Sequence, residues 1–228
     1  MAFFGILALL VFVGAIVWPQ FWVKRVMARH NVVREDFPGT GGEFAQHLIE
    51  RFELLDVGVE ETEGGDHYDP ESKTVRLSKT HFYEATLTGV AVAAHEVGHA
   101  LQDANNERSF RLRNGLVSIA RVTDRFASVF FIAAPLFGVF LQSPRAGFIF
   151  VAIGIGFLAM RVLVHLITLP VEYDASFGKA LPILEEGGYL SGEDMPAARS
   201  VLKAAAFTYV AGALMGMIDL ARWIRMIR

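Results

Sequence analysis

The residues best suited to chemistry form the run His95-Glu-Val-Gly-His99. On an α-helix, side chains four positions apart lie on one face, about 5–6 Å apart at their Cβ atoms. His95 and His99 can therefore direct imidazole nitrogens at one metal ion. Glu96 lies beside the pair, where its carboxylate can take a proton from a zinc-activated water. The pattern predicts one Zn²⁺ ion and hydrolytic chemistry.

The competing interpretation is a helix that carries three polar residues by coincidence. A His-Glu-x-x-His pattern arises by chance in well under about one chain of this size in a hundred. The run also lies within an apolar helical pattern that includes Val92, Val97 and Leu101. Two buried imidazoles and a carboxylate without a metal would cost several kcal/mol of desolvation, so the zinc interpretation is favoured. Gly98 keeps the helix thin and would let another segment or a substrate approach closely.

A catalytic zinc site takes three protein ligands and keeps one open position. The best third donor is Glu172, which follows Pro170 and is expected to open a new helical run that folds back on the motif helix. An ordinary acid at a helix N-terminus is the alternative. Asp174 is a weaker candidate, because a two-residue offset turns it away from the face of Glu172. His67, in a predicted turn, could border the site or have only a surface role.

Hydrophobic periodicity and turn residues predict a small α+β segment around the motif. Thr40-Gly-Gly-Glu43 has the spacing of a capping box. The strand at 74–78 could act as an edge strand that pairs with an extended substrate, or could be purely structural. The expected elements are a helix from Glu43 to Leu55, strands at 57–61 and 74–78, a turn over 63–73, and a helix from Thr86 to Asp103 that carries the motif.

The composition indicates a membrane protein. Hydrophobic residues make up 53% of the 228 residues and the mean hydropathy is +0.39, more than a chain of this length can bury in cores of its own. A net charge of −3 gives no indication of nucleic-acid binding, and the absence of cysteine excludes thiolate ligands. Four stretches have lengths near the ~20 residues of a span: about 2–22, 126–142, 146–170 and, less clearly, 201–220.

Lys and Arg flank these stretches and predict their orientation. Lys24, Arg25 and Arg29 follow the first stretch, and further arginines precede the second. By the positive-inside rule, the segment from about 24 to 125 is cytoplasmic and the N-terminus is outside. The expected organisation is an N-terminal anchor at 1–23, a catalytic domain at 24–115, and a membrane helical region at 116–228 that supplies the third zinc ligand.

Five sequence blocks, in this order, resemble the YugP-type membrane zinc metallopeptidases of bacteria: "DHYDP", "KTVRLS", "VAAHEVGHALQ", "TLPVEYDAS" and "AAAFTYVA". This resemblance implies an inner-membrane zinc peptidase with His95 and His99 as ligands and Glu96 as catalytic base. The chain is more distantly similar to the HtpX and Ste24 membrane peptidases. In that group a Glu-x-x-x-Asp pattern supplies a zinc-binding Glu and an Asp that orients a motif histidine. Glu172 matches the first position, whereas Ser176 stands at the second, so Ser176, Asp174 or another group would have to orient the histidine.

These observations predict an α-helical membrane protein of three to four spans with a small α+β, zincin-like domain. The expected function is a zinc-dependent endopeptidase of the bacterial inner membrane, with its site facing the cytoplasm and Glu96 as general base and acid. The expected partners are a peptide or protein substrate, which could itself be a membrane protein, and the lipid bilayer. Tyr173, next to Glu172, is a candidate for substrate binding. A catalytically inactive zinc-binding scaffold or chaperone is the alternative.

Overall fold

The computed structural model describes residues 2–37, 39–119, 129, 133, 140 and 144–226. The chain forms two compact units. The first comprises Met1–Trp18, Leu112–Leu169 and Tyr209–Arg228, and the second comprises Pro19–Arg111 and Pro170–Thr208. The second unit carries the β-sheet and all of the candidate site residues, so it is the unit that matters most for function.

The predicted capping box opens helix α2, which runs from Gly41 to Arg51. The Thr40 hydroxyl accepts from the Glu43 amide at 3.2 Å, and the Glu43 carboxylate accepts from the Thr40 amide at 2.8 Å. The helix ends four residues before the expected Leu55. Glu53 has φ +55°, and the amide of Leu54 donates back to the carbonyl oxygen of Ile49. This is the left-handed ending that closes many helices.

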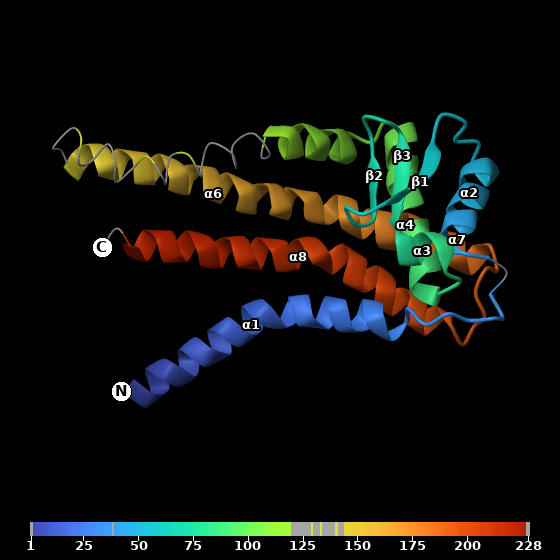
Figure 1. Ribbon diagram of the computed structural model, residues 1–228, viewed down its shortest axis with the longest axis horizontal. Helices are drawn as coiled ribbons and strands as arrows, with labels where there is room; N and C mark the ends of the chain where they lie inside the picture. The colour runs from blue at the N-terminus through green and yellow to red at the C-terminus, as the bar shows by residue number, and fades with distance from the viewer. Residues whose placement is uncertain are drawn as a thin grey trace. The chain divides into compact units, whose positions relative to one another are not determined.

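The sheet has three strands, β1 (Gly58–Thr62), β2 (His67–Asp69) and β3 (Thr74–Ser78) (Figure 1). Their order is β1-β3-β2, with β1 parallel and β2 antiparallel to β3. Two predictions are corrected. The segment 63–73 is not only a turn, because residues 67–69 within it pair with β3 and form β2. The strand at 74–78 is central rather than an edge, so its backbone already pairs on both sides and is not available to a substrate.

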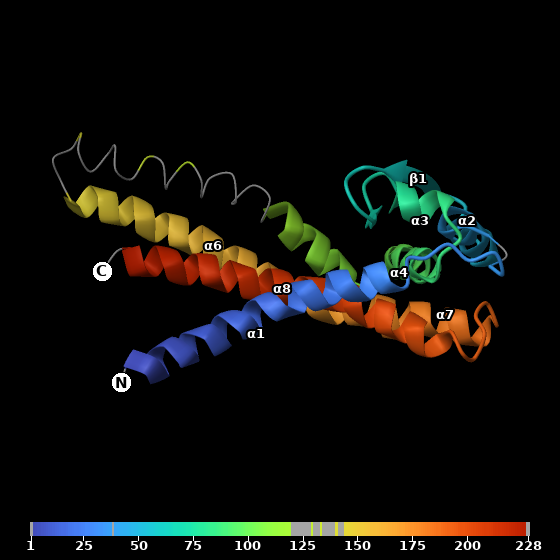
Figure 2. The same ribbon diagram turned by 60° about the horizontal axis from the view of Figure 1, so that its bottom comes forward.

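The motif helix, α4, runs from Leu87 to Ala104 and confirms the predicted helix from Thr86 to Asp103. Thr86 caps it by accepting from the Gly89 amide at 2.9 Å. Fifteen of its 18 residues are buried, so this helix is covered on every side. In Figure 2, α4 lies between a layer containing β1, α2 and α3 (Lys79–Tyr83) and a layer containing α7 (Leu181–Glu186).

The segment that carries Glu172 does not begin a new helix after Pro170, as expected. Instead, α6 runs from Pro144 through Pro170 to Tyr173 and continues as a π-helix, η1 (Asp174–Ala180). Short π-helical insertions often accompany functional sites. The close approach predicted at Gly98 is confirmed, because a Cβ atom there would lie 2.9 Å from the carbonyl oxygen of Ala175 in η1. Gly98 therefore allows α4 and η1 to pack backbone against backbone.

Three long helices contribute residues to both units: α1 (Ala2–Arg29), α6 and α8 (Met195–Met226). Residues 108–119 are also helical. In the described part of the chain, one continuous helical stretch, Phe148–Glu186, is long and apolar enough to cross a membrane, and an 18-residue window within it has a mean hydropathy of 2.2. The expected stretch at 126–142 lies outside the described residues. The protein is mostly helical with a small sheet, as predicted, whereas three to four spans are not confirmed.

Candidate metal centre

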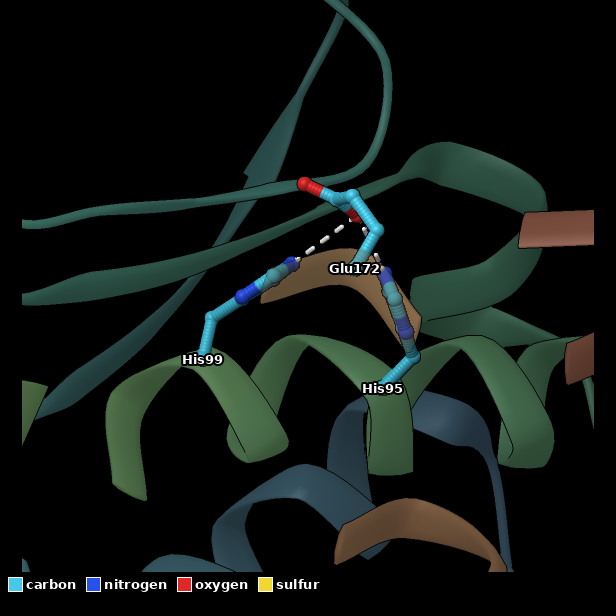
Figure 3. A group of neighbouring side chains, drawn as sticks. All are labelled: His95, His99 and Glu172. Carbon is cyan, nitrogen blue, oxygen red and sulfur yellow. Dashed lines mark hydrogen bonds and ion pairs between the residues drawn. The ribbon is translucent and has the colours of Figure 1, made fainter. Parts of the chain in front are cut away.

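His95 and His99 project from α4 towards Glu172 at the end of α6 (Figure 3). The Nε2 atoms of both histidines lie 3.3 Å from Oε2 of Glu172. One ligand atom from each residue lies within 4.8 Å of the other two. The three residues are 4%, 3% and 1% exposed, respectively, so the structure brings the three predicted ligands together in a buried group.

The two nitrogen–oxygen distances fit one zinc ion. Ligand atoms at about 2.0–2.1 Å from a tetrahedral Zn²⁺ are separated from each other by about 3.3–3.4 Å. Both nitrogen–oxygen distances have this value. Two imidazoles and one carboxylate are also a donor set that zinc takes in catalytic sites. The group can therefore hold one Zn²⁺ ion.

The orientation of His95 is fixed by Ser176. The Ser176 hydroxyl donates to the carbonyl oxygen of Leu202 at 3.0 Å and lies 3.0 Å from Nδ1 of His95. Since its single proton is used on Leu202, the hydroxyl oxygen accepts from the Nδ1–H of His95. Nε2 of His95 then carries a lone pair and faces Glu172.

The orientation of His99 is fixed by Gln102, a residue that the sequence interpretation missed. Oε1 of Gln102 lies 2.9 Å from Nδ1 of His99, and a carbonyl oxygen can only accept. His99 therefore donates from Nδ1 and directs the lone pair of Nε2 at Glu172. The signal was present in the spacing, because residues three apart on a helix are neighbours and Gln102 follows His99 by three.

The tautomers of His95 and His99 indicate that a cation can bind between them and Glu172. With both Nδ1 protons donated elsewhere, the Nε2 lone pairs of His95 and His99 converge with a carboxylate oxygen of Glu172 at 3.3 Å. Three electron-pair donors in this arrangement repel each other unless a positive charge lies between them. A bound metal ion would supply that charge, as would protons on the two Nε2 atoms, and two imidazoles with one carboxylate are a donor set that Zn²⁺ takes in catalytic sites.

Glu96 is the buried acid on the motif helix, with 6% of its surface exposed. It follows His95 directly on α4, so it lies beside the histidine pair, about 100° around the helix axis. A carboxylate in this position could exchange a proton with a water molecule bound near the two histidines, which is the role predicted for Glu96.

Aromatic rings pack along the side of His99. The ring of Phe110 lies 5.9 Å from that of His99, and the ring of Tyr68 lies 6.2 Å from that of Phe110. The Tyr68 hydroxyl donates to Asp103 at 2.8 Å. Burial and the Asp103 carboxylate raise the pKa of Tyr68 far above its usual value, so this hydroxyl stays protonated and keeps donating to Asp103.

The remaining predicted residues lie farther out. Asp174 is not part of the ligand group but accepts from Gln102 at 2.8 Å. His67 lies in β2, where its Nδ1 atom is 2.8 Å from the carbonyl oxygen of Gly65. Tyr173 is 62% exposed, and the centre of its ring lies 4.8 Å from that of Phe177, with the two rings tilted.

A His-Glu-x-x-His helix completed by a carboxylate from a later helix defines the class of zinc peptidases. The chain belongs to the family described as "Putative neutral zinc metallopeptidase", which matches residues 5–228. It is 33% identical over 213 residues to the "Putative membrane protease YugP" of Bacillus subtilis (strain 168), covering 92% of this chain and 91% of that protein. No solved structure matches the chain.

Proposed function

We propose that this chain is an integral membrane zinc-dependent endopeptidase. One observation carries the proposal: the Nε2 atoms of His95 and His99 each lie 3.3 Å from Oε2 of Glu172, which is the separation expected between two ligand atoms of one zinc ion. The family to which the chain belongs supports the same activity. The substrate would be a peptide or protein, and the class named for the B. subtilis relative supports a membrane setting.

The residues of the chain would divide the work as follows. A bound zinc ion supplies a Lewis acid that polarises the peptide carbonyl and makes a water molecule more acidic. His95, His99 and Glu172 hold that ion. Glu96 takes a proton from the attacking water and delivers it to the leaving amine, as a general base and then a general acid. Burial of the group excludes bulk water, which strengthens the electrostatic interactions on which these steps depend.

The proposed location is a bacterial inner membrane, crossed several times, with the site on the cytoplasmic side. Support comes from the apolar length of α6 and from three exposed cations, Lys24, Arg25 and Arg29, that follow the apolar part of α1. Cations in this position are typical of the cytoplasmic end of a span. Two tryptophans, Trp18 and Trp22, precede them, as is typical of the membrane–water boundary.

The metal content of the purified protein tests the ligands. We expect about one zinc per chain in the wild type and a large loss in Glu172→Ala. Glu185→Ala, a change of an exposed acid on α7, serves as the control and should keep the metal. If Glu172→Ala kept its full zinc content, Glu172 would not be a ligand, and Asp174 and His67 would become the candidates for the third ligand.

Turnover of casein and of a detergent-solubilised membrane protein tests the chemistry. We expect hydrolysis that a chelator abolishes and that Zn²⁺ restores. Glu96→Gln should keep zinc but lose hydrolysis, because an amide cannot accept the proton. Equal turnover by Glu96→Gln would end the proposed role of Glu96. Zinc binding without any turnover in the wild type would favour the alternative, a zinc-binding membrane scaffold or chaperone.

A further inference from the structure

Gln102 joins the two elements that carry the proposed metal ligands. It lies on α4, one turn after His99, and its side chain is fully buried. Its Nε2 atom donates to the carbonyl oxygen of Val171 at 2.9 Å and to Oδ2 of Asp174 at 2.8 Å. These two acceptors flank Glu172 in the chain. One amide group therefore ties the histidine helix to the glutamate segment.

The orientation of this amide is determined by its partners. Val171 offers a carbonyl oxygen and Asp174 a carboxylate, and neither can donate a proton. Both N–H bonds of Gln102 must point at them, which leaves Oε1 facing Nδ1 of His99 at 2.9 Å. A flipped amide would place N–H groups against the N–H of His99 and oxygen against two oxygens, so that orientation is excluded.

Asp174 is in turn held from the outside. The ammonium group of Lys179 forms ion pairs with Asp174 and with Glu107, the latter at 2.8 Å. Gly178 leaves the space that Asp174 occupies, because a Cβ atom at 178 would overlap Oδ1 of Asp174. The hydrogen-bonded chain thus runs from His99 through Gln102 and Asp174 to Lys179.

We propose that Gln102 is a positioning residue for the metal centre: its amide oxygen accepts from Nδ1 of His99 and so fixes the tautomer and ring orientation of that ligand. The inference rests on the proposed binding of zinc by His95, His99 and Glu172. It differs from a purely structural role, in which Gln102 would only join two helices and would not affect the affinity for zinc.

Two variants at Gln102 separate these roles. Gln102→Met has similar length and no hydrogen bonds, whereas Gln102→Glu keeps an acceptor for His99 and loses both donors. We expect Zn²⁺ affinity, measured by competition with a chelator, to fall by about 10–100-fold in Gln102→Met. In Gln102→Glu it should stay within about threefold of wild type. Thermal unfolding of the metal-free proteins should show Gln102→Glu to be no more stable than Gln102→Met, since its carboxylate faces two oxygens.

If Gln102 positions His99, Gln102→Glu binds zinc more tightly than Gln102→Met although it is no more stable. If Gln102 only joined the two helices, zinc affinity would instead follow stability in the two variants. The visible spectrum of the Co²⁺-loaded protein adds a readout of ligand geometry, and it should change in Gln102→Met. An unchanged spectrum together with wild-type zinc affinity in Gln102→Met would overturn the proposal. So would equal losses of affinity in Gln102→Met and Gln102→Glu.

A third variant tests the hydrogen-bonded series from His99 to Lys179 without changing Gln102. It also covers the case in which the Gln102 variants do not fold. Gly178→Ala pushes Asp174 away from Gln102 at an exposed position. We expect zinc affinity to fall several-fold relative to Gly192→Ala, where an added Cβ meets nothing within 4 Å. Equal affinity in the two variants would remove Asp174 from the positioning chain.

The same measurements distinguish this inference from the proposed function. A wild-type protein that binds no zinc would end the proposed function. A wild-type protein that binds zinc, beside a Gln102→Met variant that binds it equally well, would end only the role of Gln102.

Discussion

The hydroxyl oxygen of Ser176 lies 3.0 Å from Nδ1 of His95 and accepts its proton. In the Glu-x-x-x-Asp pattern that the chain partly matches, a carboxylate would stand at this position. The other motif histidine, His99, is also oriented by a neutral group, the amide of Gln102. A carboxylate partner raises the basicity of a ligand imidazole more than a neutral partner does, so this centre combines two weakly polarised imidazoles with one anionic ligand.

The contact between Ser176 and His95 leads to a first prediction. Ser176→Ala removes the acceptor for Nδ1–H and leaves His95 free to rotate or to change tautomer. We expect zinc affinity to fall about tenfold, as measured by chelator competition. Ser200→Ala, a hydroxyl deletion at a half-buried position of α8, is the matched control. Wild-type affinity in Ser176→Ala would show that the hydroxyl does not orient the ligand.

Features determined by local chemistry could be predicted from the sequence. The capping box at Thr40 and Glu43 forms as expected, and the motif helix begins beside its Thr86 cap. In both cases a short side chain accepts a backbone proton a few residues away, so the pattern and the structure involve the same residues. The meeting of Glu172 with His95 and His99 was also predictable, because a zinc site requires a third ligand.

Features determined by tertiary packing could not be predicted. The three residues of β2 are too few to show alternation, and only pairing with β3 makes them a strand. The central place of β3 depends on that same pairing. The continuation of α6 through Pro170 into a π-helix depends on packing against α4, which local propensity does not report. Gln102 was missed because its spacing from His99 indicates only that the two side chains are neighbours, whereas its role depends on Val171 and Asp174, which fix the orientation of the amide.

The close packing of α4 on η1 gives a second prediction. Gly98→Ala would place a Cβ atom 2.9 Å from the carbonyl oxygen of Ala175, a backbone atom that cannot move alone. The two elements must separate, so we expect a loss of about 1–3 kcal/mol in the free energy of unfolding and weaker zinc binding. Gly115→Ala adds a Cβ in a helix where nothing lies within 4 Å. It should leave stability unchanged or raised by up to about 1 kcal/mol. Similar unfolding free energies for the two variants would contradict the packing argument.

The absence of cysteine from the chain allows a direct test of the proposed topology. We expect Glu50→Cys, on the exposed face of α2, to resist a membrane-impermeant maleimide in intact bacterial cells and to react after lysis. Arg145→Cys, between the predicted spans at 126–142 and 146–170, should react in intact cells. The positive-inside rule assigns these positions to opposite sides. Labelling of Glu50→Cys in intact cells would place the zinc domain outside the cytoplasm.

The ion pair between Asp69 and Arg76 gives a prediction for pH. Their side chains meet at 2.6 Å and each is 26% exposed. Burial raises the pKa of Asp69. Hydrogen bonds from Arg76, the Glu71 amide and Ser72 lower it by more, so the net result is a pKa of about 2, below the usual value. Because the folded-state pKa is lowered, the stabilisation is present above the unfolded value near 4. It is lost as the pH falls through about 2.

Asp69→Asn should therefore destabilise the protein by about 0.5–1 kcal/mol at neutral pH, the range for a partly exposed pair. The difference from wild type should shrink as the pH is lowered below about 4, because the Asp69 carboxylate is then protonated in the unfolded wild type before it is protonated in the folded protein. Thermal unfolding from pH 7 to pH 2.5 measures both effects. Glu60→Gln removes a longer contact of 3.3 Å between Arg76 and an acid that is 61% exposed, so its effect should be smaller. A constant difference between Asp69→Asn and wild type over this range would show that the Asp69 charge does not stabilise the fold, since a lost charge interaction must fade as the wild-type carboxyl is protonated.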